Sequence, residues 1–294
     1  MGFDMISPYN IRMLPGSSYD REKSRKLYVV QTKFRPTFGA YGIYDGKRVF
    51  EIEESIRATA AMTEDELDSF KILHWLLYFC WTARIGRLPL ELARLEGINP
   101  GKILHEIATS PHHILKKTFQ VMLKKSRKEW FDTREEILEN YSNTKQFEEM
   151  TKNFSKLNSL YIAMLYNDQQ VIDALMGELQ RLVRKHIETS GQYDKELLDD
   201  LMKVTGLSTC KNLLEGENRN LVSCCGKAAA LILNDSSLQK HQQVELAIYR
   251  PKEHVSLCRY YLQPDGIIDL SLLNLTRFFE TGGDRVFTKI ISRA

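Results

Sequence analysis

The sequence changes character near Thr63, and this change limits the possible folds more than any other feature. Up to about Glu54 the chain is strand-like and rich in glycine, with a hairpin signal, Asp45-Gly46, between two strand-like runs. From Thr63 the letters "TEDE" predict a helix start, because Glu66 follows the capping threonine by three positions. An apolar helical pattern then continues to Trp81. We therefore expect a small strand-containing part followed by a large helical part.

The opening residues contain a strand, a turn and a helix in close succession. The apolar run from Ile11 to Leu14 stops at the turn signal Pro15-Gly16, and a charged helical stretch begins at Ser17 or Ser18. A second strand-like run follows from Leu27 to Phe34. The first strand therefore needs a sheet elsewhere in the fold to pair with.

Helical patterns continue to Gly206, and beyond it the sequence is mixed, with a strand-like "VELAIYRP" and a turn-rich "QPDGIIDLSLLNLTRFFETGG". Between Asp168 and Glu188 one apolar face is formed by Val171, Leu175, Leu179, Leu182 and Val183. The 294 residues, 43% of them hydrophobic, suffice for a substantial core. We predict a mainly α fold with a small α+β N-terminal part and a mixed C-terminal end, divided into 1–60, 61–206 and 207–294.

Charge, cysteine content and hydropathy exclude several classes of protein. A formal charge of +3 is too near balance to predict a nucleic-acid partner. Five cysteines without regular spacing predict no disulfide framework, and no secretory signal is present, so we expect a cytoplasmic protein. The most apolar stretch, Phe70 to Trp81, is shorter than the roughly 20 residues of a membrane helix. We interpret it as a buried helix and expect no membrane span.

The residues that commonly bind metals do not occur here in metal-binding patterns. His105, His112 and His113 are separated by a Ser-Pro helix break, which favours surface or capping roles. Cys224 and Cys225 are adjacent and cannot act as a CxxC pair. No phosphate-binding glycine loop, HExxH motif or nucleophile elbow occurs. The sequence therefore predicts no metal site and identifies no catalytic residue.

Two weaker candidates remain. In "EIEES", Glu53 and Glu54 suit the first turn of a helix, whereas Glu51 alternates with its apolar neighbours and is expected to point toward Arg35 or a polar cleft. The ion pair that would join Arg35 to the hairpin is an equally good structural interpretation.

The other candidate is a basic helix, "KKTFQVMLKKSRKEW", that could form a contact surface. Its Lys124, Lys125 and Lys128 accompany a coherent apolar face. A solvated helix face is the favoured reading, because the chain as a whole is nearly neutral.

The first part of the chain resembles the C-terminal part of radical SAM enzymes that contain an N-terminal cobalamin-binding domain. The matching segments are "IRMLPGSS", similar to a late barrel strand with its PGT-like turn, then "TKFR", "YGIYDGKRVFEIEE" and "TAAMTEDELDSF". Their order and spacing agree over roughly the first eighty residues. The helical remainder resembles the variable C-terminal extension of that family.

The resemblance implies cleavage of S-adenosylmethionine at an iron–sulfur cluster and, in cobalamin-binding members, methyl transfer. The family holds the cluster with a CxxxCxxC loop, because iron–sulfur clusters need thiolate ligands. No three cysteines of this chain have that spacing, and none precedes Cys80. We therefore expect no cofactor to bind this chain alone and expect an upstream-encoded polypeptide to supply the cluster-binding half of the barrel.

Site residues transferred by the resemblance are few. Pro15 and Gly16 match the late turn near the cofactor end of the family's barrel, and Ser17 stands where the family usually has threonine. The predicted function is that of a C-terminal fragment or split subunit of a radical SAM enzyme, not catalytic alone. The alternative is a stand-alone helical protein-interaction module with the basic helix as its contact surface. An independent hydrolase or transferase ranks last, since no nucleophile or metal set is recognisable.

Overall fold

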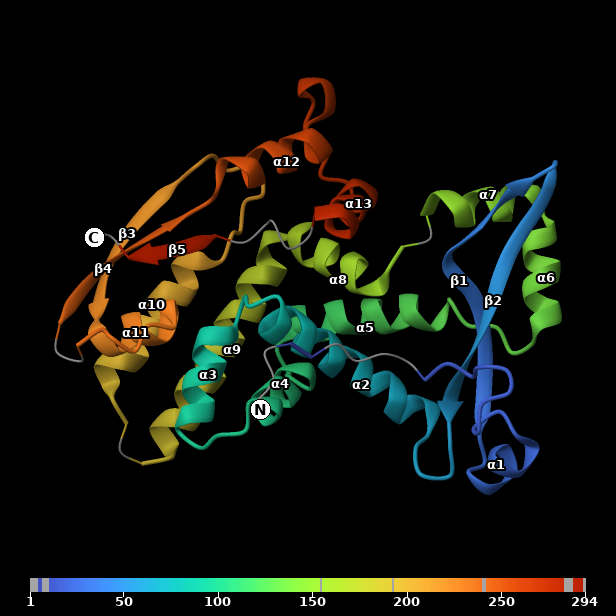
Figure 1. The fold of residues 1–294 in the computed structure, drawn as a ribbon, viewed down its shortest axis with the longest axis horizontal. Helices are drawn as coiled ribbons and strands as arrows, with labels where there is room; N and C mark the ends of the chain where they lie inside the picture. Colours follow the sequence, from blue (N-terminus) through green and yellow to red (C-terminus); the bar gives the residue numbers. More distant parts are fainter. Residues whose placement is uncertain are drawn as a thin grey trace. The chain divides into compact units, whose positions relative to one another are not determined.

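The computed structural model describes residues 5–6, 11–153, 155–191, 193–239, 242–282 and 288–292 of the chain. Over these residues helices predominate, and the strands form two small antiparallel sheets (Figure 1). The predicted mainly α fold with a small β-containing part is therefore confirmed. The described strands form no barrel. Within the same ranges, no helix combines the length and the apolar character that a membrane crossing requires.

The contacts within the chain divide it into two compact units. Unit 1 contains Met1–Ser7, Trp75–Thr118 and Asn158–Ala294, and unit 2 contains Pro8–His74 and Phe119–Leu157. Unit 2 thus joins the strand-like N-terminal residues to a later helical segment. The divisions expected from the sequence, 1–60, 61–206 and 207–294, stay a prediction.

Unit 2 is built on a long two-stranded ribbon formed by β1 (Gln31–Tyr44) and β2 (Lys47–Ala58). Asp45 at φ 52° and Gly46 at φ 71° have the left-handed backbone that a two-residue hairpin turn requires. The predicted hairpin is therefore confirmed. The helices of this unit are α1 (Glu22–Leu27), α2 (Glu64–Leu76), the end of α5 (His113–Arg127), α6 (Arg134–Ser142) and α7 (Thr144–Asn153).

Local signals place the helices of unit 2 against the ribbon. The amide of Glu66 donates to Thr63 Oγ1 at 3.2 Å and the amide of Thr63 donates to Glu66 Oε2 at 2.8 Å, which is the reciprocal capping that "TEDE" predicts. The ring of Phe50 lies 5.7 Å from that of Tyr141 in α6 and 6.2 Å from that of Phe147 in α7. These two helices therefore pack beside the hairpin end of the ribbon (Figure 1).

The run from Ile11 to Leu14, expected to be a late barrel strand, pairs with β2 instead. An antiparallel bridge joins Arg12 to Ser55, and the amide of Met13 donates to the carbonyl oxygen of Glu54 at 2.8 Å. The run thus continues the antiparallel ribbon of its own unit. The turn at Pro15-Gly16 is confirmed. The run from Ile11 to Leu14 contributes a single bridge at Arg12 rather than a strand, and the helix begins at Glu22 rather than at Ser17 or Ser18.

Unit 1 is mainly helical and includes a three-stranded sheet in the order β3-β4-β5. Its elements are the π-helix η1 (Leu77–Thr82), α3 (Arg87–Leu95), α4 (Pro100–Ala108), α8 (Leu157–Tyr166), α9 (Gln169–Thr189), α10 (Lys195–Ser208), β3 (Arg219–Cys225), α11 (Gly226–Leu233), β4 (Gln243–Tyr249), α12 (Lys252–Leu262), the 3-10 turn η2 (Pro264–Gly266), α13 (Leu272–Gly282) and β5 (Lys289–Ser292).

The longest helix of unit 1, α9, organises its core. Its predicted apolar face is buried, and it packs against α3, α4 and α10. On the other side of α10 lies the sheet, and α11 contacts all three strands (Figure 1). The predicted strand in "VELAIYRP" is confirmed as β4, whereas α13 forms where we expected turns. Val255 and Cys258 of α12 and Leu275 and Phe278 of α13 are buried at helical spacing.

Two glycines of unit 1 should respond oppositely to alanine. A Cβ on Gly226 would lie 1.9 Å from the carbonyl oxygen of Gln239, so an alanine at this position would force the backbone to shift. A Cβ on Gly177 in α9 would have no neighbouring atom within 4 Å. We expect Gly226→Ala to destabilise the protein by about 1–3 kcal/mol. Gly177→Ala should stabilise it by up to about 1 kcal/mol, because alanine favours helix. Urea unfolding midpoints test both, and equal shifts for the two variants would contradict this packing.

Candidate functional site

The predicted turn at the N-terminal end of unit 2 is present. The amide of Ser17 donates to the carbonyl oxygen of Leu14 at 3.0 Å, and Gly16 has φ 79°. This is the geometry of a type II turn, which favours proline at its second position and a glycine with positive φ at its third, as Pro15 and Gly16 provide. The Gly16 amide also donates to Asp20 Oδ2 at 3.0 Å. The role of Pro15, Gly16 and Ser17 near a cofactor stays a prediction.

Arg35 belongs to a charged cluster, but its partners differ from the expected one. Its Nε donates to Glu53 Oε1 at 2.5 Å and its Nη1 to Glu129 Oε2 at 3.0 Å. Arg35 and Glu53 are direct partners in the β1–β2 register, and Glu51 is exposed. Glu53 and Glu54 lie inside β2, so their assignment to a first helical turn was wrong. A register shift between Pro36 and Tyr41 brings Glu53, rather than Glu51, opposite Arg35.

Trp130 lies at the centre of this cluster. The guanidinium carbons of Arg35 and Arg57 each lie 4.7 Å from the centroid of its ring, and Lys71 Nζ lies 5.8 Å from it. These distances are within the range of cation–π attraction. The aromatic ring therefore holds cations from β1, β2 and α2 close together.

Asp68 supplies the principal negative charge among these cations. Its carboxylate accepts from Arg57 Nη2 at 2.7 Å and from Arg127 Nε at 2.6 Å, and Lys71 Nζ lies at 2.9 Å. Burial alone would raise the pKa of Asp68, but the hydrogen bonds and charges of these three cations lower it to about 2. The carboxylate therefore stays ionised at neutral pH, although its side chain is only 1% exposed.

The neighbouring groups are pushed toward their neutral forms. Burial raises the pKa of Glu129, and burial together with the charge of Arg57 lowers the pKa of Lys71. Most charged groups of the cluster pair with one another and join the ribbon to α2 and to the end of α5. We interpret this cluster as a structural element of unit 2.

The predicted basic surface is partly available for contact. Lys124 and Lys128 are exposed and Lys125 is half-buried, and none of the three forms an ion pair with a described residue. Arg127 of the same segment instead binds Asp68. Lys124, Lys125 and Lys128 therefore remain a candidate contact surface.

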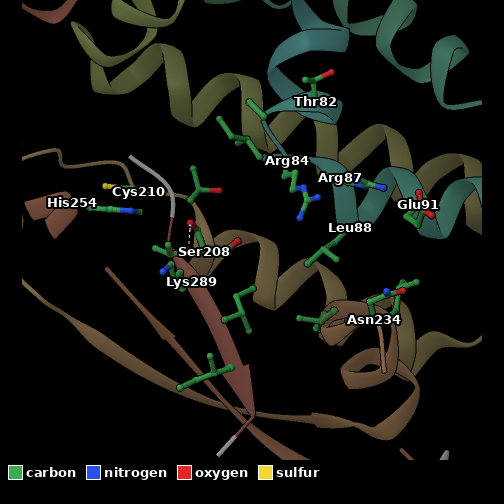
Figure 2. A pocket seen from close by; sticks show the side chains of 18 of the residues that line it. Thr82, Arg84, Arg87, Leu88, Glu91, Ser208, Cys210, Asn234, His254 and Lys289 are labelled. Atoms are coloured by element: carbon green, nitrogen blue, oxygen red, sulfur yellow. Dashed lines mark hydrogen bonds between the residues drawn. The ribbon is translucent and has the colours of Figure 1, made fainter. Parts of the chain in front are cut away.

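A pocket in unit 1 is a further candidate, which the sequence analysis did not identify (Figure 2). Its volume is about 760 Å³. The turn between η1 and α3 forms one wall, and residues of α3, α11, α12 and β5 and the ends of α8 and α10 form the others. The charged and polar lining residues that matter most are Arg84, Arg87, Glu91, Tyr166, His254 and Lys289.

Figure 2 shows the guanidinium of Arg84 directed into the centre of this pocket, with Arg87 and Glu91 on the α3 side and Lys289 on the opposite side. Arg84 and Arg87 lie on either side of Ile85-Gly86, shortly after the apolar helix, and this local pattern is the sequence signal that could have indicated the pocket. The remaining lining residues come from elements that are far apart in the sequence. Their convergence depends on the tertiary fold.

The cysteines of this chain do not fit an iron–sulfur cluster. All five are buried, and burial raises the pKa of Cys80 to about 12 and those of Cys210 and Cys224 to about 11. Cluster ligands must be thiolates. Among the described residues, no three metal-binding side chains converge. No step of a reaction is therefore assigned to a cluster in this chain.

Comparison of the sequence with protein-family models and with curated proteins finds no match. The function is therefore inferred from the resemblance of the N-terminal segment and from the geometry described above.

Two aspartates of α2 provide a test of the charged cluster. We expect Asp68→Asn to destabilise the protein by roughly 3 kcal/mol, because it leaves buried cations without their counter-ion. Asp65→Asn is the matched control, since Asp65 binds Arg127 from a side chain that is 89% exposed, and it should cost at most about 1 kcal/mol.

The pH dependence of stability should differ as well. The pKa of Asp68 is lowered in the folded state, so its contribution is complete above 3.8 and is lost as the pH falls toward about 2. Asp68→Asn should remove this part of the acid sensitivity, as measured by urea unfolding at a series of pH values. If Asp68→Asn changed neither the stability nor its acid sensitivity, the stabilising role assigned to Asp68 in the cluster would be wrong.

Proposed function

We propose that this chain acts as the C-terminal part of a radical SAM enzyme, together with a polypeptide that carries the cluster-binding part. The observation that supports this most is an accumulation of exposed apolar side chains in the same segment that resembles the family. These residues, which we together call the N-terminal apolar surface, are distributed along the ribbon from its turn to α1. They are Ile11, Leu14, Tyr19, Leu27, Tyr28, Val29, Phe38, Ile43, Tyr44 and Val49.

The exposure of these side chains is large. Leu14 is 63% exposed, Leu27 67% and Ile43 64%. Single exposed apolar residues are normal in proteins, but many within one short segment favour an interaction site. The free energy gained on covering them scales with area, at roughly 25 cal/mol per Å². A protein surface with complementary apolar residues is the partner that this chemistry fits.

The ribbon provides a second means of contact. Among the described residues, bridges to other segments occur along its edges at Phe34, which pairs with Phe131, and at Ser55, which pairs with Arg12. The backbone of β1 and β2 nearer to the turn presents strand edges to which another strand can add. In this proposal the partner supplies S-adenosylmethionine chemistry and the cluster, and this chain supplies the docking surface.

The proposal is tested by co-expression with an adjacently encoded polypeptide that contains CxxxCxxC. We expect the two to co-purify and to cleave S-adenosylmethionine to 5′-deoxyadenosine, measured by chromatography. The double variant Leu14→Lys and Ile43→Lys should weaken co-purification at least about tenfold, because two buried lysines would lack partners. Tyr260→Lys, at a site that is 75% exposed in unit 1, is the control. Absence of both complex and cleavage would defeat the proposal.

A second candidate function is that of a helical interaction module with Lys124, Lys125 and Lys128 as its contact surface. The lack of ion pairs at these three residues among the described residues favours it. Such lysines can bind a partner with complementary acidic side chains, and the attraction weakens as salt rises.

Charge reversal distinguishes the two candidates. If the basic helix is the contact surface, changing Lys124, Lys125 and Lys128 to Glu should abolish co-purification of a partner, with unchanged circular dichroism. Changing the exposed Lys102, Lys145 and Lys195 to Glu alters the net charge equally and is the control. If the N-terminal apolar surface is the contact surface, both triple variants should retain the partner. Retention would exclude the basic helix.

A further inference from the structure

The pocket of unit 1 has the size of a small-molecule site. Its volume of about 760 Å³ lies within the roughly 300–1,000 Å³ that such sites usually have. It lies entirely within unit 1, whereas the N-terminal apolar surface belongs to unit 2. An inference about its ligand therefore does not rest on the proposed function.

The charges that line the pocket favour an anion. Arg84, Arg87 and Lys289 contribute positive charge against the single carboxylate of Glu91. Arg84 and Lys289 are exposed and have no ion-pair partner in the described part of the chain. A concave surface of one sign raises the local concentration of ions of the opposite sign. The guanidinium of Arg84 is also suited to bind a carboxylate or phosphate in a bidentate manner.

The backbone that positions Arg84 is irregular at two successive places. The preceding turn, η1, is a π-helix, a form that is frequent at functional sites. Arg84 itself has φ 66°, a left-handed conformation that costs a residue with a side chain roughly 1–2 kcal/mol. The amide of Ala83 donates to the carbonyl oxygen of Tyr78 at 2.8 Å and that of Gly86 to Cys80 at 3.0 Å. These bonds hold the turn and so direct the Arg84 side chain into the pocket.

Two buried polar atoms of the lining residues have no hydrogen-bond partner among the described residues. They are the hydroxyl oxygen of Tyr166 and the Oε2 atom of Glu91. A buried polar group without a partner costs about 1–3 kcal/mol. Burial also raises the pKa of Tyr166, so its hydroxyl keeps the proton that it can donate. A ligand with an oxyanion and a donor group would satisfy both atoms.

Part of the remaining lining is apolar. Ile85, Leu88, Leu231, Ile232 and Ile290 line the same pocket. A free inorganic ion would leave this surface in contact with water, whereas the apolar body of an organic anion would cover it.

We propose that the pocket of unit 1 binds a small organic anion, whose phosphate or carboxylate group contacts Arg84 and Lys289 and whose apolar body lies against Ile85 and Leu88. The hydroxyl of Tyr166 donates a hydrogen bond to the bound molecule. This binding site consists only of residues of this chain.

Calorimetric titration of the full chain tests the site with three probes: phenyl phosphate, benzoate and inorganic phosphate. We expect saturable binding of at least one aromatic probe, and weaker binding of inorganic phosphate, because it lacks the apolar body. Comparison of phenyl phosphate with benzoate shows which oxyanion the site prefers. Arg84→Gln should weaken binding at least about tenfold, Arg84→Lys less, and Arg259→Gln, an exposed arginine on α12, not at all.

Thermal unfolding of Tyr166→Phe gives an independent readout. Because the hydroxyl of Tyr166 has no hydrogen-bond partner among the described residues, its removal should leave the Tm unchanged or raise it, while it reduces the rise in Tm that the bound probe causes. A tyrosine with only a structural role would lower the Tm and leave the rise unaltered, which would contradict its place in the site. No saturable binding of either aromatic probe, equal binding by Arg84→Gln, or tighter binding of inorganic phosphate than of both aromatic probes would overturn the proposal.

Discussion

The contact between Arg57 and Asp68 is the interaction on which unit 2 depends. Both side chains are 1% exposed, so each charge would cost several kcal/mol if its partner were lost. Because Arg57 belongs to β2 and Asp68 to α2, the pair fixes the ribbon relative to the helix that follows it. Trp130 and Arg127 extend the same cluster to the end of α5. A two-stranded ribbon alone is only marginally stable in water, and this cluster provides the packing that it lacks.

The two units present different chemistry to their surroundings. Unit 2 combines an internally paired charged cluster with the N-terminal apolar surface, which suits association with another protein. Unit 1 combines an apolar helical core with a pocket of positive charge, which suits a small anion. The two proposals therefore concern separate residues, and either one can stand without the other. The resemblance to radical SAM enzymes bears only on the first of them.

Local chemistry allowed part of this structure to be predicted. The hairpin at Asp45-Gly46 and the capping of α2 by Thr63 form as expected, because each depends on residues within four positions of one another. The apolar face of α9 was also predicted correctly from its periodicity. By contrast, Glu53 was placed in a helix, since its neighbouring carboxylates resemble a first helical turn. Its pairing with Arg35 across the ribbon decided otherwise.

The sequence by itself determined the hairpin at Asp45-Gly46, the capped start of α2, the apolar face of α9 and the absence of a cluster-binding cysteine motif, since each of these depends on residues that are close together along the chain. Only the tertiary structure decided that the run from Ile11 to Leu14 joins the ribbon, that Arg57 and Asp68 are buried together, and that Arg84 and Lys289 line one pocket. These contacts join residues that are distant in the sequence. They form because burying apolar surface lowers the free energy of the folded state, and because buried charges must be paired with one another. Neither effect depends on how far apart the residues lie along the chain.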